Sequence, residues 1–160
     1  AACLTFGGAL AVSPAFREQV YHWFMESYRT HNSYVFSGEQ PEEDIGEWTF
    51  GALPEGFEET ERHSSGGYRG SVVYQDSQGR DMRLTYIYMA VANINLDNER
   101  HVITKTMVNG HLAEVYMSTE ELSSNMMLVF DQEDGIVFLI EAWEDYDGMI
   151  ALAESIQRVE

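Results

Sequence analysis

The stretch from residue 127 to 156, MLVFDQEDGIVFLIEAWEDYDGMIALAESI, is the feature that most constrains the fold. It contains two apolar runs joined by a turn with Asp134-Gly135, and it ends in a segment with helical spacing. Successive side chains of a strand point to opposite faces, so a strand with one face in water alternates apolar and polar residues. Both sets are apolar in these two runs. They therefore predict a central β-hairpin that is covered on both faces.

The strand predicted over 82–91 shows the same pattern. Its apolar side chains fall on both faces: Met82, Leu84, Tyr86 and Tyr88 on one, and Ile87, Met89 and Val91 on the other. Leaving one full-size apolar side chain in water forfeits about 1.5–3 kcal/mol, so five or six of them need cover. A C-terminal helix would cover one face. The other requires an N-terminal helix, a partner, a ligand or a sheet that curls on itself. If the N-terminal helix does not occupy this second face, we expect it to be the functional surface.

Turn residues place two further hairpins and define the fold class. Residues 76–79 (Asp-Ser-Gln-Gly) join two β-type runs, and Asn109-Gly110 joins HVITKTMV to HLAEVYMS with the sequence typical of a type I′ turn. Residues 37–47 are predicted to form a loop, 93–100 a connection, and about 147–158 a helix that Asp145 or Asp147 can cap. The chain is thus predicted to be a single α+β domain over 37–160. An antiparallel, hairpin-built sheet of about six strands would carry an N-terminal and a C-terminal helix.

The first 36 residues predict an anchor followed by an amphipathic helix. Residues 1–12, AACLTFGGALAV, resemble the end of a membrane span, which needs about 20 apolar residues. A lipoprotein signal with Cys3 as the lipidated residue, a signal peptide and a buried helix are the alternatives. Ser13 and Pro14 suit a helix start, so 13–36 is predicted to be helical. Its apolar stripe would consist of Phe16, Val20, Trp23, Phe24 and Tyr28.

The charge of the chain excludes some partners. Its 27 acidic and 9 basic residues give a formal net charge of −18, which disfavours nucleic acid and anionic lipid surfaces. Cys3 is the single cysteine, so the chain forms no internal disulfide. Membrane contact is therefore expected only through the N-terminal segment, and the chain is expected to be extracytoplasmic and tethered to the cell membrane.

No motif predicts catalysis, a metal or a cofactor. The five histidines have no zinc-hydrolase spacing, and the acidic turn from Asp131 has Ala142 where a calcium loop of the EF-hand type requires Glu. Nucleophile-elbow, P-loop and dinucleotide-binding motifs are absent from the sequence. The acidic clusters fit solvated loops better than a glycosidase pair, since nothing in the sequence gives two carboxylates a shared pocket. We therefore expect a non-enzymatic protein without a metal or cofactor.

Several strings of the sequence occur together in a known family. They are, in order, LPEGFEE, a Tyr-x-Asp-x-x-Gly hairpin, VNGHLAEVY, LVFDQEDGIVFLI and ALAESI. Over roughly residues 48–158 the chain resembles the bacterial domain-of-unknown-function family numbered four-three-six-seven. That family is common in Firmicutes and often follows a single transmembrane segment. Some of its members carry a cytoplasmic zinc-binding anti-sigma-factor domain ahead of that segment. The chain departs from the family pattern at Phe130, where a Trp is usual.

A second, distant resemblance involves Leu53–Phe57 and Ala153–Ile156. These segments are similar to the start and end of the C-terminal domain of periplasmic regulators of the envelope-stress sigma factor. The chain differs in having Ile140-Glu141-Ala142 where those proteins have Val-Gly-Glu. Both resemblances imply an anti-sigma-factor-like module outside the membrane.

Together these observations predict a sensor or interaction domain of a membrane-tethered regulator. Its partner, a protein or an envelope ligand, would bind an apolar sheet face, and a homodimer is left open. The predicted face consists of Tyr86, Ile87, Tyr88, Met89, Leu139 and Trp143. The alternatives are a lipid- or carbohydrate-binding domain, for which a concave apolar cavity is expected, and a carboxylate-based hydrolase, for which two converging acids are expected.

Overall fold

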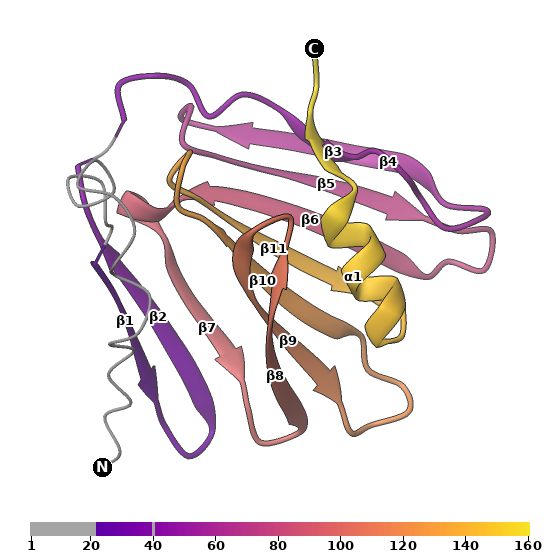
Figure 1. Cartoon of the computed structure of the whole chain (residues 1–160). Helices are drawn as coiled ribbons and strands as arrows, with labels where there is room; N and C mark the ends of the chain where they lie inside the picture. Colours follow the sequence, from indigo (N-terminus) through magenta and orange to yellow (C-terminus); the bar gives the residue numbers. More distant parts are fainter. Residues whose placement is uncertain (1–21, 40) are drawn as a thin grey trace.

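The computed structural model of the chain describes residues 22–39 and 41–160, and it is mostly β-structure with one short helix (Figure 1). The elements in chain order are β1 (His22–Ser27), β2 (His31–Ser37), β3 (Trp48–Phe50), β4 (Glu58–Ser65), β5 (Arg69–Gln75), β6 (Asp81–Tyr88), the 3-10 turn η2 (Met89–Val91), β7 (Asn93–Asp97), β8 (His101–Val108), β9 (His111–Ser118), β10 (Asn125–Asp131), β11 (Ile136–Ala142), α1 (Tyr146–Glu154) and β12 (Ile156–Arg158).

A seven-stranded antiparallel sheet in the order β4-β5-β6-β11-β10-β9-β8 forms the centre of the domain. The predicted hairpins β5–β6, β8–β9 and β10–β11 are confirmed, and β11 lies in the middle of the sheet. Asn109 and Gly110 have φ values of 49° and 86°, as the predicted type I′ turn requires. The sequence thus predicted the centre of the sheet correctly.

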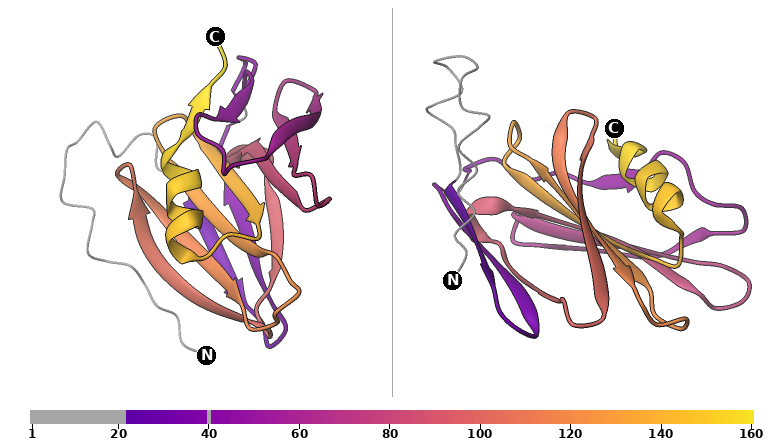
Figure 2. Two further views of the ribbon diagram at one scale, coloured as in Figure 1. Left: turned by 90° about the vertical axis from the view of Figure 1, so that its right-hand side faces the viewer. Right: turned by 60° about the horizontal axis from the view of Figure 1, so that its bottom comes forward.

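The first face of the central sheet packs against α1 and the two-stranded sheet β3–β12 (Figure 2). The predicted cap is confirmed, because the Asp145 carboxylate accepts a hydrogen bond from the Gly148 backbone N–H at 2.9 Å. The helix buries Met149, Leu152 and Ala153. It ends at Glu154, and the segment after it pairs with β3 instead of extending the helix to residue 158 as predicted.

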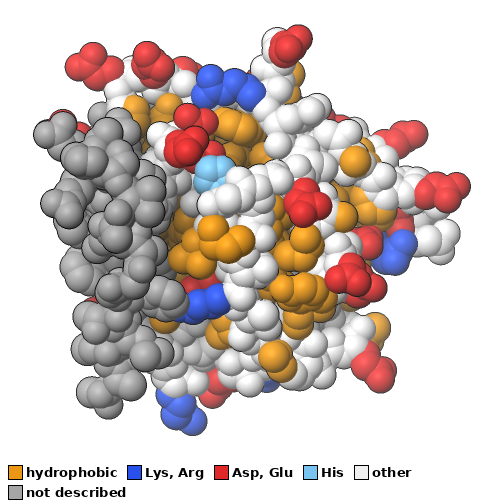
Figure 3. Space-filling model, viewed as in Figure 1, with side chains coloured by type: hydrophobic (Ala, Val, Ile, Leu, Met, Phe, Trp, Pro, Cys, Tyr) orange, Lys and Arg blue, Asp and Glu red, His pale blue; other side chains and the backbone are white. Residues whose placement is uncertain are grey.

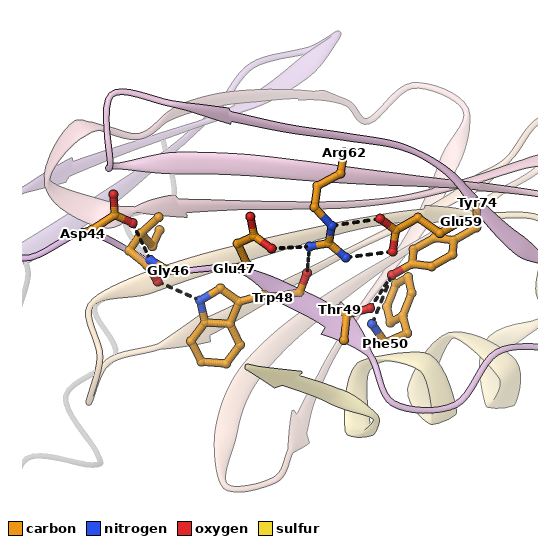
Figure 4. A network of polar contacts seen from close by, with 10 residues as sticks. Asp44, Gly46, Glu47, Trp48, Thr49, Phe50, Glu59, Arg62 and Tyr74 are labelled. Carbon is orange, nitrogen blue, oxygen red and sulfur yellow. Dashed lines mark hydrogen bonds and ion pairs between the residues drawn. The ribbon is translucent and has the colours of Figure 1, made fainter. Parts of the chain in front are cut away.

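Polar contacts attach β3 and the loop before it to the central sheet (Figure 4). The Arg62 guanidinium of β4 donates to the Trp48 carbonyl oxygen at 3.1 Å and to both Glu59 carboxylate oxygens at 2.8 Å. The Tyr74 hydroxyl contacts Thr49 Oγ1 at 2.7 Å. The hydrogen bonds from Arg62 lower the pKa of the Glu59 carboxyl group, since donation from a cation favours its charged form.

The second face of the central sheet is covered by the three-stranded sheet β1-β2-β7. The covering residues are Tyr34 and Phe36 from β2, Met89 and Ala92 around η2, and Ile94 and Leu96 from β7. They pack on side chains of β9, β10 and β11, among them Phe130, whose ring lies 6.0 Å from that of Tyr34 and 6.1 Å from that of Phe36. A small sheet therefore provides the cover that the sequence led us to expect from a helix.

Two predictions for this part of the chain are wrong. The helix predicted over 13–36 is replaced by β1 and β2 from residue 22 onward, while residues 13–21 lie outside the described part of the chain. The connection predicted over 93–100 begins with β7. In β2, Asn32, Tyr34 and Phe36 are buried with a spacing of two, as in a strand with one covered face. Three strands protect more of a flat apolar face than one helix does, so tertiary packing overrides the helical spacing of the aromatic residues.

Candidate functional site

The second face of the central sheet has a covered half and an open half. The covering sheet extends over β9, β10 and β11 as far as Ile87 and Leu139, which are partly buried at its margin. Beyond that margin, side chains of β4, β5 and β6 project from the second face, among them Glu61, Val73, Gln75 and Asp81. Six further residues of these strands line a hollow there. We call them the β4–β6 face: His63, Ser65, Arg69, Ser71, Arg83 and Thr85.

The covered half contains a buried polar network between the two sheets. Glu114 of β9 is fully buried, and its carboxylate accepts a short hydrogen bond from the Tyr34 hydroxyl of β2. Its other oxygen lies 3.3 Å from Lys105 Nζ. The Tyr116 hydroxyl contacts Tyr34 and accepts from Asn32 Nδ2 at 2.7 Å. Burial, aided by the nearby carboxylate, raises the pKa of Tyr34 far above its ordinary value, so its hydroxyl stays protonated and donates. These hydrogen bonds connect β2 to β9 across the two sheets, which is a structural role.

The β4–β6 face contains a hollow of about 200 Å³, which we call the Arg69 hollow. Strand register explains its lining, because Ser71 lies directly opposite both His63 and Thr85, while Arg69 lies opposite Ser65. Gly70 and Ser64 complete the lining, and Arg83 closes one end. The hollow thus gathers two arginines, His63 and hydroxyl groups. No carboxylate lines it, but the Glu61 carboxylate next to it lies 3.3 Å from His63 Nε2.

A second hollow of about 340 Å³, the Trp143 hollow, lies next to it and shares Arg83. Arg80, Asp81, Glu141 and the exposed indole of Trp143 also line it. Asp81 accepts a hydrogen bond from the Gln75 amide at 2.7 Å, and Glu141 lies 3.9 Å from Arg83. Both carboxylates contact solvent and have polar partners.

The arginines of these hollows stand out against an acidic surface. In the view of Figure 3, which shows another side of the molecule, acidic side chains clearly outnumber Lys and Arg. Only nine residues of the chain are basic, yet Arg69, Arg80 and Arg83 line the two hollows. Arg80 is bound to Asp76 at 2.7 Å, whereas no described carboxylate is within ion-pair distance of Arg69. The β4–β6 face thus carries two of the nine basic residues of an acidic chain.

The six residues predicted to form the binding face do not form one surface. Tyr86 and Tyr88 are buried under the first face, and Met89 is buried under the covering sheet. Ile87 and Leu139 are partly buried at the margin of the open half, and Trp143 is 40% exposed. A partner in solution can therefore reach mainly Trp143 and the edges of Ile87 and Leu139.

Sequence reasoning missed the residues of the β4–β6 face. The signal was present in β6, where Arg83 and Thr85 alternate with buried apolar residues as in a strand with one open face. It was also present in β5, where Arg69 and Ser71 are two residues apart and therefore point to the same face of the sheet. The cross-strand register, which brings these side chains together, could not be read from the sequence.

The described part of the chain lacks both a membrane-spanning helix and a cluster of metal-ligand side chains. None of its helices is both long and apolar enough to cross a membrane. No group of three or more His, Cys, Asp or Glu side chains within this part is placed to hold a metal ion.

Comparison with known proteins gives one match. The family model described as a domain of unknown function (DUF4367) matches residues 47–156, more than half of the chain. The chain belongs to the DUF4367 family. The matched region contains the whole central sheet, α1 and both hollows, whereas β1 and β2 lie before it. No match was found among curated proteins or among solved structures.

Proposed function

We propose that this DUF4367 chain is a non-enzymatic, extracytoplasmic sensor or interaction domain of a membrane-tethered bacterial regulator, and that its partner or ligand docks on the β4–β6 face. One observation carries the proposal: the covering sheet protects only half of the second face and leaves the other half open, with an exposed Trp143 at its margin. Aromatic residues and arginines are the residue types most enriched at protein interfaces.

The rigidity of the rest of the domain supports this proposal. Both faces of β9, β10 and β11 are packed, and the hydrogen bond between Tyr34 and Glu114 joins the two sheets. Binding sites placed on strands of a packed scaffold are held more precisely than sites on loops. The tether, the extracytoplasmic location and the association with anti-sigma-factor proteins are parts of the same proposal. They rest on residues 1–12 and on the sequence resemblances.

A carbohydrate-binding domain is the second candidate, and the Trp143 hollow favours it. An exposed indole beside Asp81, Glu141 and Arg80 offers an apolar stacking surface next to hydrogen-bonding groups. The hollow is open and shallow, which fits a weakly held sugar unit better than an enclosed lipid chain.

Site-specific photo-crosslinking tests the docking face in the membrane-tethered protein. A photoreactive amino acid replaces Trp143 in one variant and Val159 in the other, since these two side chains are exposed to 40% and 41%. We expect a discrete adduct of increased mass from position 143 and none from position 159, because Val159 lies beyond the β3–β12 sheet. Equal adducts from both positions, or none from position 143, would contradict the proposal.

A further inference from the structure

The Arg69 hollow has the composition of an oxyanion site. Its side chains are two arginines, one histidine and four hydroxyl residues, namely Ser64, Ser65, Ser71 and Thr85. Each guanidinium carries five N–H donors in a fixed fork and accepts nothing, and each hydroxyl can donate one hydrogen bond. A carboxylate ligand offers two acceptor oxygens, whereas a phosphate group offers three or more and can use a larger share of these donors.

The strand register directs these donors toward one point. His63, Ser71 and Thr85 form a row across β4, β5 and β6, because Ser71 pairs with both of the others. Arg69 lies two residues along the strand from Ser71, and Arg83 lies two residues from Thr85 in the opposite direction. Two residues of a strand span about 6–7 Å, which a guanidinium can bridge. The two arginines therefore flank a row of smaller donors and can converge above it.

The charge balance of the chain makes this cluster unusual. Among the described Lys and Arg residues, all but Arg69 and Arg158 lie within 4 Å of a carboxylate, and Arg158 stacks on Trp48. Arg83 is 3.9 Å from Glu141, which is too long for a hydrogen bond, and Arg69 has no described carboxylate partner. On a chain with 27 acidic residues, Arg69 thus has no described ion-pair partner and Arg83 has only a long ion pair. Exposed charges more than about 8 Å apart are screened at physiological ionic strength, so distant carboxylates do not cancel them.

We propose that the Arg69 hollow binds a phosphate group, held in a bidentate manner by Arg69 and Arg83 above the row of His63, Ser71 and Thr85. This inference rests on the proposed function, since it names the ligand chemistry of the same face. The phosphate is either free or carried by a small ester. Anionic lipid headgroups in a membrane are disfavoured, because a domain with a formal charge of −18 is repelled by such a surface.

A titration followed by NMR of the backbone amides and arginine side chains tests the proposal on the whole chain. The probes are inorganic phosphate and glycerol phosphate, and sodium chloride at matched ionic strength is the reference. We expect saturable shifts at Arg69, Ser71, Arg83 and Thr85 with phosphate and none with chloride. Stronger binding of the ester would show that a ligand carries the group, and stronger binding of the inorganic ion would show that it is free.

Charge-matched variants separate a local site from general electrostatics. Arg69→Gln and Arg83→Gln should each weaken phosphate binding about tenfold or more, since a hydrogen bond between charged groups has that worth. Arg100→Gln removes the same charge from an exposed arginine that pairs with Glu120 and does not line the hollow, so it should leave the affinity unchanged. All three arginines are exposed, and a dispersed amide spectrum confirms that each variant is folded.

Two outcomes overturn the proposal: shifts that never saturate, or an equal effect of Arg100→Gln and Arg69→Gln. The photo-crosslink from position 143 then tests separately whether a partner docks on the β4–β6 face. If that adduct forms and is unaffected by Arg69→Gln, the docking face stands and only the phosphate chemistry fails. If the adduct is also absent, both proposals fail.

Discussion

Replacing Tyr34 by Phe tests whether β2 packs on the second face of the central sheet. The change removes one hydroxyl group from a fully buried side chain and leaves its ring in place. That hydroxyl donates to the carboxylate of Glu114, which is 80 residues away in the sequence and also fully buried. A hydrogen bond to a charged group is worth about 1.5–3 kcal/mol, and a buried carboxylate that loses a donor gains no water in exchange.

We therefore expect Tyr34→Phe to lower the free energy of unfolding by about 2 kcal/mol. Urea unfolding followed by tryptophan fluorescence measures this change, and for m values of about 1–3 kcal/mol/M the midpoint should fall by about 1 M. Tyr28→Phe is the matched control, because Tyr28 is 50% exposed and donates to Glu26 in water. The control should change the stability by no more than about 0.5 kcal/mol.

A double-mutant cycle with Glu114→Gln attributes the effect to the contact itself. The two substitutions should be non-additive, because either one removes the charged hydrogen bond between the sheets. Equal stabilities of Tyr34→Phe and Tyr28→Phe, or fully additive effects in the cycle, would refute the placement of β2. A helix over this segment would not bring residue 34 to β9 in this register, so the outcome also decides between the two folds considered for this segment.

Two further predictions concern β4 and β5. Gly70→Ala should lower the free energy of unfolding by about 1–3 kcal/mol, since the new Cβ would lie 2.4 Å from the Tyr86 ring. Tyr86→Leu in the same chain should relieve part of this loss. A thermal midpoint that Gly70→Ala leaves unchanged would contradict the packing of Gly70 against Tyr86. Arg62 lowers the pKa of Glu59, so the stability that this carboxylate contributes is present above its unfolded pKa of about 4.3 and is lost as the pH falls through the lower folded value. Because the Glu59 side chain is 39% exposed, Glu59→Gln should lower the free energy of unfolding by at most about 1 kcal/mol at pH 7 and not at all well below pH 4. Urea midpoints at both pH values measure this difference. A loss of stability that grows in acid would disprove the prediction.

The central hairpins could be predicted because local chemistry determines them. Asn109-Gly110 favours positive φ at two successive residues, which few other dipeptides do, and the flanking strands then have a fixed register. The apolar runs of β10 and β11 predicted cover on both faces, and each face is buried. In this part of the chain, turn chemistry and hydrophobic pattern favour the same structure.

The N-terminal segment could not be predicted in this way because two patterns compete in it. Trp23, Phe24 and Tyr28 have helical spacing, whereas Tyr34 and Phe36 alternate as in a strand. Local propensity does not decide between them. The decision comes from the apolar second face of β9, β10 and β11, which strands β2 and β7 cover with paired backbones. The residues 93–97, NINLD, illustrate the same limit, since their polar members resemble a turn until Ile94 and Leu96 are buried.

The candidate site shows why the expectation about the second face was too coarse. Ile87 and Met89 indicated a uniformly apolar face, but Arg83 and Thr85 lie on the same side of β6 as Ile87. The face therefore changes from apolar to polar along a single strand, and the covering sheet ends where this change occurs. If the open half were an apolar face that had lost its cover, each of its apolar side chains in water would forfeit about 1.5–3 kcal/mol of burial free energy. Instead it carries arginine and hydroxyl groups, which are stable in water and also suited to an anion, so a polar partner or ligand fits it better than an apolar one.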